Sequence, residues 1–193
     1  MINDGSFLAL DLEMNQPSGK IIQVGIAIGD VDMRYDDYFV KSWYIDPKEE
    51  ISSFITELTG ISSSTIRGEA FSHEYVAREL SAVINQYKPF INPVVWGHND
   101  SDDLSKEFSQ NNVDFGHFGQ RWIDVKTWHT YLMLSRAKSV GGSLKDACAS
   151  HNINFIGLEH RADVDAKNTL ALFFKLLRRQ SSMESMALIG KEI

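Results

Sequence analysis

Two carboxylates interrupt the first apolar segment of the chain, Phe7-Leu8-Ala9-Leu10-Asp11-Leu12-Glu13-Met14. The apolar residues predict a buried β-strand over residues 6–14, and alternate side chains of a strand point to the same face. Asp11 and Glu13 are therefore expected on one half-buried face, where they repel each other and lose hydration. A divalent cation relieves both penalties, because hard cations prefer oxygen ligands. An exposed strand end with two solvated acids is the alternative explanation, and the Asp-x-Glu pair alone does not exclude it.

Two further groups of polar residues stand where predicted elements begin. Trp96-Gly97-His98-Asn99-Asp100-Ser101-Asp102-Asp103 lies between a short apolar strand and a helix. His160-Arg161-Ala162-Asp163-Val164-Asp165 leads into the last predicted helix. Helix capping explains acids at both places, since carboxylates are stabilised near helix N-termini. Capping does not explain His160, because a cation is unfavourable at the start of a helix.

The elements that must position these residues predict an α/β domain. Strands are expected at residues 6–14, 21–28 and 38–45, and their short, turn-rich links favour an antiparallel meander. Two short strands follow, at residues 94–96 and 122–123. Helices are expected after Ser72, around Leu104 and Phe108, from Asp124 to Met133, after Ser143 and from Ala162 to Arg179. Strands that alternate with helices after an initial meander predict a five-stranded mixed sheet, three antiparallel strands then two parallel ones, flanked by helices.

Composition narrows the class of protein. The 193 residues are 43% hydrophobic, which is enough for the core of a single domain. With 19 Lys+Arg against 26 Asp+Glu, the net charge of −7 disfavours tight, sequence-independent binding of duplex DNA. The single cysteine, Cys148, is expected to be a small buried residue and cannot form an internal disulfide. No stretch predicts a signal peptide or a membrane span, so the expected location is the cytoplasm.

Taken in chain order, the three polar groups resemble the DEDDh branch of the proofreading-type 3′–5′ exonucleases. That branch carries Asp-x-Glu on the first strand, an acid after a middle strand, and His-x-Ala-x-x-Asp near the C-terminus. The resemblance covers residues 6–178 of a single exonuclease domain, with a tail at 180–193. Ile21-Ile22-Gln23-Val24-Gly25 resembles the second strand of the family. Thr56-Glu57-Leu58-Thr59-Gly60-Ile61 and Trp96-Gly97-x-x-Asp100 are most similar to the Eri-like and sporulation-inhibitor-like exonucleases, several of which act on RNA.

Two residues compete for the middle acid. The proofreading pattern His-Asn-x-x-x-Asp begins at His98 and selects Asp103, whereas the Eri-like pattern Trp-Gly-x-x-Asp selects Asp100. Helix register favours Asp100, since it precedes Leu104 and Phe108 at intervals of four residues and so starts the inward face. Asp103 suits a capping role in the first turn. Both assignments stay open from the sequence.

The resemblance implies a ribonuclease H-like fold and a site for two metal ions. Asp11, Glu13, Asp100 and Asp165 would hold two Mg²⁺ or Mn²⁺ ions about 3.5–4 Å apart, which clamp the scissile phosphate. His160 would act as the general base that takes a proton from the attacking water. Leu12 and Met14 would contact the terminal nucleotide, although packing in the core explains these apolar side chains equally well.

The expected activity is metal-dependent hydrolysis of single-stranded nucleic acid from a free 3′ end, with release of nucleoside 5′-monophosphates. RNA is favoured and DNA is the alternative substrate. Two other functions remain open, a non-catalytic domain of the same fold that binds nucleic acid or protein, and a phosphodiesterase of small nucleotides. The weakly amphipathic tail is expected to pack on the domain, to form a homodimer contact or to fray.

Overall fold

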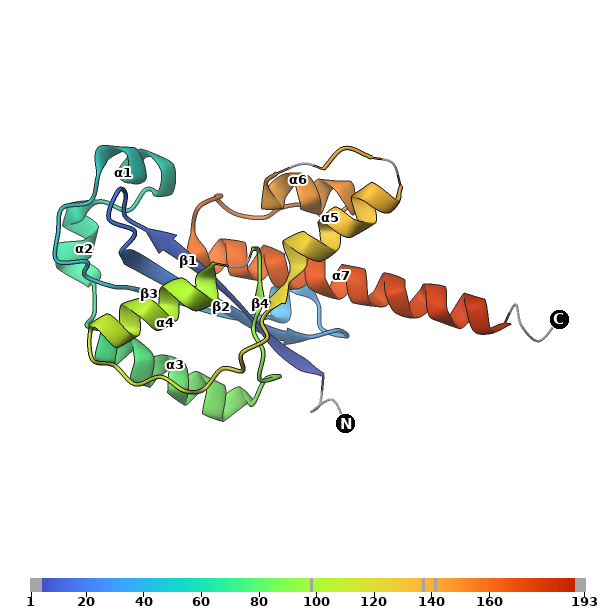
Figure 1. Ribbon diagram of the computed structural model, residues 1–193, viewed down its shortest axis with the longest axis horizontal. Coiled ribbons are helices and arrows are strands. Elements are labelled where there is room, and N and C mark those ends of the chain that lie inside the picture. Colours follow the sequence, from blue (N-terminus) through green and yellow to red (C-terminus); the bar gives the residue numbers. More distant parts are fainter. Residues whose placement is uncertain (1–4, 98, 137, 141, 190–193) are drawn as a thin grey trace.

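The computed structural model describes residues 5–97, 99–136, 138–140 and 142–189, and its centre is a five-stranded sheet (Figure 1). The strands lie in the order β3-β2-β1-β4-β5. β1 pairs with β2 and β2 with β3 in antiparallel fashion, whereas β1 pairs with β4 and β4 with β5 in parallel. The strands span Ser6–Met14 (β1), Ile21–Asp30 (β2), Phe39–Tyr44 (β3), Val94–Val95 (β4) and Ile123–Asp124 (β5). The predicted mixed sheet is confirmed.

Helices surround the sheet, and three of their predicted starts are confirmed. They span Ser53–Thr59 (α1), Ser63–Glu69 (α2), His73–Tyr87 (α3), Asp100–Gln110 (α4), Val125–Ser135 (α5), Leu144–Ser150 (α6) and Ala162–Ile189 (α7), with a single 3-10 turn at Tyr35–Asp37 (η1). Ser72, Asp124 and Ser143 each accept a hydrogen bond from the backbone N–H three residues later. These side chains satisfy N–H groups that have no partner within the helix, which fixes where α3, α5 and α6 begin.

Two short helices were not predicted. α1 and α2 lie together at one end of the molecule (Figure 1) and begin at the serine caps Ser52 and Ser62. Each has 7 residues, and α1 ends at Gly60, which adopts the left-handed conformation. Such short helices show too few apolar repeats for the helical period to appear in the sequence. Their isoleucines bury Ile22 of β2 beneath them.

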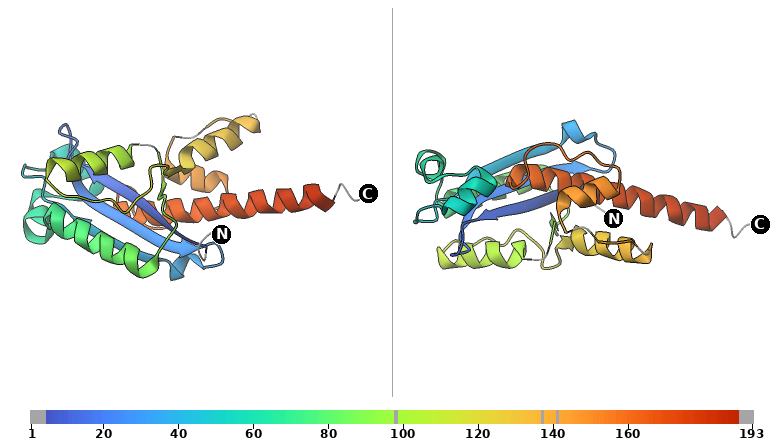
Figure 2. Two further views of the ribbon diagram at one scale, coloured as in Figure 1. Left: turned by 60° about the horizontal axis from the view of Figure 1, so that its bottom comes forward. Right: turned by 90° about the horizontal axis from the view of Figure 1, so that it is seen from above.

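The last helix extends further than expected. α7 continues through Ile189, and Figure 2 shows it running along the sheet and then beyond the rest of the molecule. The side chains from Arg178 to Ser185 are exposed, so residues 180–185 of the predicted tail do not pack on the domain. This part of α7 is surrounded by solvent and has no face packed against the sheet. The helical repeat of apolar residues therefore ends at Leu177.

The two faces of the sheet carry separate cores. Even-numbered residues of β1 belong to one core and odd-numbered residues to the other. The first core includes Leu8, Leu10, Leu12, Val76 and Leu80 of α3, and Leu104 and Phe108 of α4. The second includes Ala9, Val125 of α5, Leu144 of α6, and Leu170 and Phe174 of α7. Asp11 and Glu13 continue the odd-numbered series, so they face α7, as the alternation of side chains predicted.

Two further expectations concern the environment of the chain. Cys148 is a buried free thiol in the second core, as predicted. Burial raises the pKa of Cys148 to about 12, which keeps the thiol protonated and unreactive. Among the residues that the structure describes, no helix combines the length and the apolar character needed to cross a membrane. The cytoplasmic location stays a prediction.

Candidate active site

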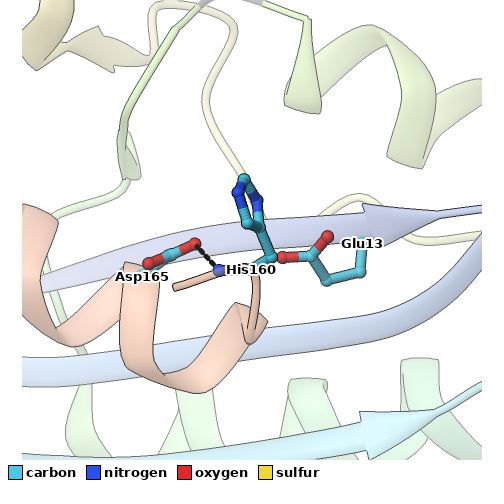
Figure 3. Close-up of side chains that lie close together, drawn as sticks. All are labelled: Glu13, His160 and Asp165. Carbon is cyan, nitrogen blue, oxygen red and sulfur yellow. Dashed lines mark hydrogen bonds between the residues drawn. The ribbon is translucent and has the colours of Figure 1, made fainter. Parts of the chain in front are cut away.

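The predicted site residues lie where three elements meet at one edge of the sheet. Asp11 and Glu13 stand near the C-terminal end of β1, and Asp100 is the first residue of α4, which follows the neighbouring strand β4. Because β1 and β4 are parallel, their C-terminal ends share this edge, where open α/β sheets bind their ligands. The N-terminus of α7 approaches the same edge and brings His160 and Asp165 to it (Figure 3).

Gly25 of β2 allows the first turn of α7 to pack closely against the sheet. Gly25 of β2 is the register partner of Asp11. A Cβ atom at position 25 would lie 2.1 Å from the carbonyl carbon of Ala162 and 2.2 Å from the backbone nitrogen of Asp163. No side chain fits in that space, so only glycine allows the first turn of α7 to rest on β2 at this point.

A buried amide fixes the same turn. Gln23 is fully buried and is the register partner of Glu13. Its Oε1 accepts a hydrogen bond from the Ala162 backbone N–H at 3.1 Å, and its Nε2 donates to Ser42 Oγ at 3.2 Å. The Ala162 N–H is one of the helix N-terminal donors that have no partner within the helix. Gln23 and Gly25 therefore hold α7 opposite the two acids of β1.

Glu13, His160 and Asp165 lie close together where the first turn of α7 meets β1 and β2. Their ligand atoms all lie within 4.8 Å of one another, and Figure 3 shows the imidazole of His160 projecting from between the two carboxylates. Asp165 Oδ2 accepts a hydrogen bond from the His160 backbone N–H at 3.1 Å, while the buried Oδ1 has no hydrogen-bond partner among the described residues. His160 is exposed and adopts a left-handed backbone, with φ of 61°. An unpartnered buried oxygen beside a second carboxylate is what a cation would satisfy.

The buried carboxylates of the site raise one another's pKa values. Burial, and then the charges of Asp100, Asp165 and Glu13, raise the pKa of Asp11 well above its ordinary value. Burial and the charge of Asp165 raise the pKa of Glu13 to about 8, against a smaller lowering by Arg161. Burial raises the pKa of Asp165 to about 7. These acids resist ionising together, and a divalent cation would remove that resistance.

Burial and charge favour Asp100 over Asp103 as the middle acid. Burial raises the pKa of Asp100 to about 7, and Asp100 in turn raises the pKa of Asp11. Asp103 is half-buried one turn further along α4 and acts on Asp100 through its charge. His98, with which the competing pattern begins, lies outside the described residues. The assignment of Asp100 as a metal ligand stays a prediction, supported by its burial and by its charge beside Asp11.

A small cleft gives access to the cluster. It has a volume of about 290 Å³, and Asp11, Glu13, His160 and Asp165 all border it. Trp96, Leu144 and Phe155 supply apolar surface to the same cleft. The cleft thus sets acidic oxygens and one imidazole against an apolar wall, an arrangement suited to a ligand with a charged group and a flat ring.

Comparison with known proteins identifies the family. Residues 8–173 match the exonuclease family RNase_T. The chain belongs to this exonuclease family. The match falls within the span 6–178 of the predicted resemblance, and membership of the predicted exonuclease family is confirmed.

One relative of this exonuclease is the PolC-type DNA polymerase III of Latilactobacillus sakei subsp. sakei (strain 23K). The two are 26% identical over 200 residues, which cover 99% of this chain but only 12% of the polymerase. The exonuclease chain therefore corresponds to a small part of that enzyme.

Solved nuclease structures share the fold of this exonuclease. Cell-death related nuclease 4 (CRN-4) has a TM-score of 0.77 and 17% identity over 91% of this chain and 64% of its own. The nuclease domain of 3′hExo, a DEDDh family member bound to rAMP, has a TM-score of 0.75 and 15% identity over 93% of this chain and 95% of its own. E. coli Exonuclease I in complex with a dA16 oligonucleotide has a TM-score of 0.68 and 16% identity over 93% of this chain and 42% of its own. These likenesses confirm the predicted ribonuclease H-like fold.

The two predicted nucleotide contacts of the exonuclease lie on the other face of β1. Leu12 is 8% exposed and belongs to the core beneath α3 and α4, and Met14 packs against that core. Leu12 also borders the cleft, whereas the cleft does not reach Met14. Core packing accounts for both side chains, and contact of Leu12 and Met14 with a nucleotide stays a prediction.

Some site residues of the exonuclease carried no signal of their role in the sequence. Gln23 and Gly25 could be recognised only as part of the second strand, because their contacts are with α7, far along the chain. Leu144 and Phe155 are apolar residues without a distinctive spacing, so nothing separated them from ordinary core residues.

Proposed function

We propose that this exonuclease removes nucleotides from the 3′ end of single-stranded nucleic acid and releases nucleoside 5′-monophosphates. The observation that carries the proposal is the convergence of Glu13, His160 and Asp165 within 4.8 Å beside the cleft. The complexes of 3′hExo with rAMP and of Exonuclease I with dA16 support nucleotide binding by this fold. RNA is favoured because another 3′-exonuclease neighbour recognises the 3′ end of a histone mRNA stem-loop. DNA is the alternative.

The acidic residues fit a pair of hard divalent cations. Asp11, Glu13, Asp100 and Asp165 would hold two Mg²⁺ or Mn²⁺ ions, and the unpartnered Oδ1 of Asp165 supports this assignment. When bound, such ions polarise the scissile phosphate, lower the pKa of the attacking water and stabilise the leaving 3′-oxygen. They also add four positive charges to the formal net charge of −7, leaving −3. Attraction of phosphate then depends more on divalent ions than on lysine and arginine.

The chain itself supplies the base and the orientation of the substrate. His160 accepts the proton of the attacking water at its imidazole, which is exposed and projects from between two carboxylates (Figure 3). The hydrogen bond from the His160 backbone N–H to Asp165 holds the base relative to α7. The apolar wall formed by Trp96, Leu144 and Phe155 receives the terminal nucleoside, and the small cleft suits a single strand.

Degradation of matched RNA and DNA single strands tests the proposal. Oligomers of one sequence, labelled at the 5′ end, would be incubated with Mg²⁺, with Mn²⁺ or with EDTA. We expect labelled products that shorten stepwise from the 3′ end, 5′-monophosphates in the released fraction, faster loss of RNA, and no reaction in EDTA. The Asp165→Asn variant serves as the inactive control. A protein inert on both polymers in both metals, or one that shortens the 5′ end, would overturn the proposal.

A further inference from the structure

A second hollow adjoins the cleft at Trp96. It has a volume of about 430 Å³ and lies between the loop after β4 and the first turns of α5. Trp96 lines both this hollow and the cleft, and Asp100 lines the hollow. The hollow therefore begins at the wall where the cleft ends.

Strand order places the hollow along the route of a bound strand. β1, β4 and β5 are parallel neighbours, so their C-terminal ends follow one another along a single edge. Asp11 and Glu13 stand near the end of β1, Trp96 directly follows β4, and Asp124 ends β5. Neighbouring strands are about 4.8 Å apart, so β5 lies about 10 Å from β1. A nucleic acid strand with its scissile phosphate at Asp11 and Glu13 can place the nucleotides next to that bond in the hollow.

One cation stands over this boundary. Lys126, in the first turn of α5, is exposed, and its Nζ lies 5.9 Å from the centroid of the Trp96 ring. Within the described part of the chain, Lys126 forms no ion pair. An ammonium group over an aromatic wall, free of a protein carboxylate, is available to a phosphate.

One of the two carboxylates that line the hollow, Asp124, is already engaged in hydrogen bonds. Asp124 Oδ1 accepts hydrogen bonds from the backbone N–H of Gly97 and of Thr127, both at 3.2 Å, and Oδ2 accepts one from Thr127 Oγ1 at 2.6 Å. These donors stabilise the negative charge of the N-cap and hold its oxygens toward the backbone. Thr130, one turn further along α5, adds a hydroxyl group to the lining beside Lys126.

We propose that this hollow is a binding subsite for the nucleotides immediately 5′ of the scissile bond. Lys126 and Thr130 contact the phosphate next to the scissile one, and Trp96 separates this subsite from the cleft that holds the terminal nucleoside. The subsite binds any single-stranded polynucleotide, because these contacts engage phosphate rather than base edges. This inference rests on the proposed function, since it assumes that the 3′ end lies in the cleft.

Substrate length provides the test. A dinucleotide without a 5′-phosphate contains only the scissile phosphate, whereas an octanucleotide also offers the phosphate that would meet Lys126. In Lys126→Ala we expect kcat/KM for the octanucleotide to fall about tenfold through KM, the loss of one charge-assisted contact. Turnover of the dinucleotide stays at the wild-type level. Lys126→Arg should restore the octanucleotide value, because it keeps the positive charge.

A matched variant and a binding measurement complete the design. Lys106→Ala removes another exposed lysine, on α4, that lines neither the cleft nor the hollow, and it should change the hydrolysis of neither substrate. In the inactive Asp165→Asn background, fluorescence anisotropy should show weaker octanucleotide binding after Lys126→Ala and a smaller dependence of affinity on salt.

The outcomes separate this inference from the proposed function. An equal loss on both substrates, or no loss on either, would overturn the subsite while leaving the exonuclease intact. A wild-type protein that hydrolyses neither substrate would overturn the proposed function and the subsite with it.

Discussion

At the scale of residues, the acids of the site work against the stability of the metal-free protein. Burial and mutual repulsion raise the pKa values of Asp11, Glu13, Asp100 and Asp165. A carboxyl group with a raised pKa resists ionisation, so the folded state is penalised where the unfolded state ionises freely. A bound divalent cation would remove this repulsion between the carboxylates, so the same arrangement favours metal binding.

Glu13 should show this penalty as a dependence of stability on pH. Its pKa rises from 4.5 to about 8 on folding, so between these pH values the folded state binds more protons than the unfolded state. The free energy of unfolding therefore falls as pH rises through this interval. We expect Glu13→Gln in EDTA to be more stable than wild type at about pH 9, by on the order of 2 kcal/mol, and nearly equal at about pH 5.

Urea unfolding followed by circular dichroism at the two pH values measures this difference. Glu57→Gln is the control, because Glu57 is exposed on α1, and it should alter the pH dependence little. A Glu13→Gln protein that is equally or less stable than wild type at the higher pH would contradict the prediction.

His160 should be needed for turnover and not for metal binding. We expect His160→Asn to lower kcat by about 10²–10⁴-fold, the range of a lost general base. Asparagine is the suitable replacement because it tolerates the left-handed backbone at this position. Manganese affinity measured by calorimetry should stay close to wild type.

The exposed His117 offers a matched control, since His117→Asn makes the same change away from the cleft. Unchanged turnover in His160→Asn would refute the role of base. Loss of manganese binding would show instead that the imidazole is a metal ligand.

At the scale of elements, the site depends on the close packing of the first turn of α7 against β2. Gly25→Ala would force a Cβ atom to within 2.1 Å of the Ala162 backbone, which cannot rotate away as a side chain does. We expect the first turn of α7 to move and kcat to fall about 100-fold, since small displacements of catalytic groups have effects of this size. Stability should fall by about 1–3 kcal/mol.

Gly29→Ala on the same strand separates the two effects. A Cβ atom there would meet the ring of Tyr38 at 2.6 Å, away from the site. Gly29→Ala should lower stability with little loss of activity, as measured by thermal unfolding and the oligomer assay. Equal losses of activity in both variants would mean that Gly25 acts only through stability.

Elements with a long apolar period were predictable, and short ones were not. α3 repeats buried residues from Val76 to Val83 between a serine cap and Pro89, so both of its ends could be read from the sequence. α1 and α2 each bury only one or two side chains, too few to reveal a period. The projecting end of α7 has no packed face at all through Ser185, so amphipathicity could not mark its extent.

At the scale of the whole molecule, divalent ions should stabilise the fold in a pH-dependent manner. Protons and metal ions compete for carboxylates with pKa values of about 7 to 8. We expect Mn²⁺ to raise the melting temperature by several degrees more at about pH 8 than at about pH 5.5. Thermal unfolding with Mn²⁺ or EDTA measures this, with Asp165→Asn as the variant that loses the effect. An equal shift at both pH values would contradict competition at these acids.

The projecting part of α7 should be dispensable for the chemistry. A chain that ends at Gln180 loses Ser181–Ser185, which are exposed and belong to neither core, together with the residues after them. We expect its kcat to stay within about twofold of the full chain and its melting temperature to change by only a few degrees, because surface residues contribute little. A large loss of activity would show that the projection reaches the site.

Light scattering on the same two proteins tests the predicted homodimer. If the full chain is dimeric and the shortened chain monomeric, the dimer contact lies on the projection. A monomeric full chain would refute the homodimer.

The sequence by itself determined the kinds of groups in the site and the order in which they occur. Alternation along β1 placed Asp11 and Glu13 on one face, and His160 and Asp165 were recognisable at the start of the last helix, because these patterns are local. The tertiary structure decided how the groups meet. Gly25 and Gln23 hold the first turn of α7 against β2. The charge of Asp100 acts on Asp11, and the ammonium group of Lys126 lies over the ring of Trp96. These contacts join residues far apart in the chain, and local periodicity carries no information about such distances.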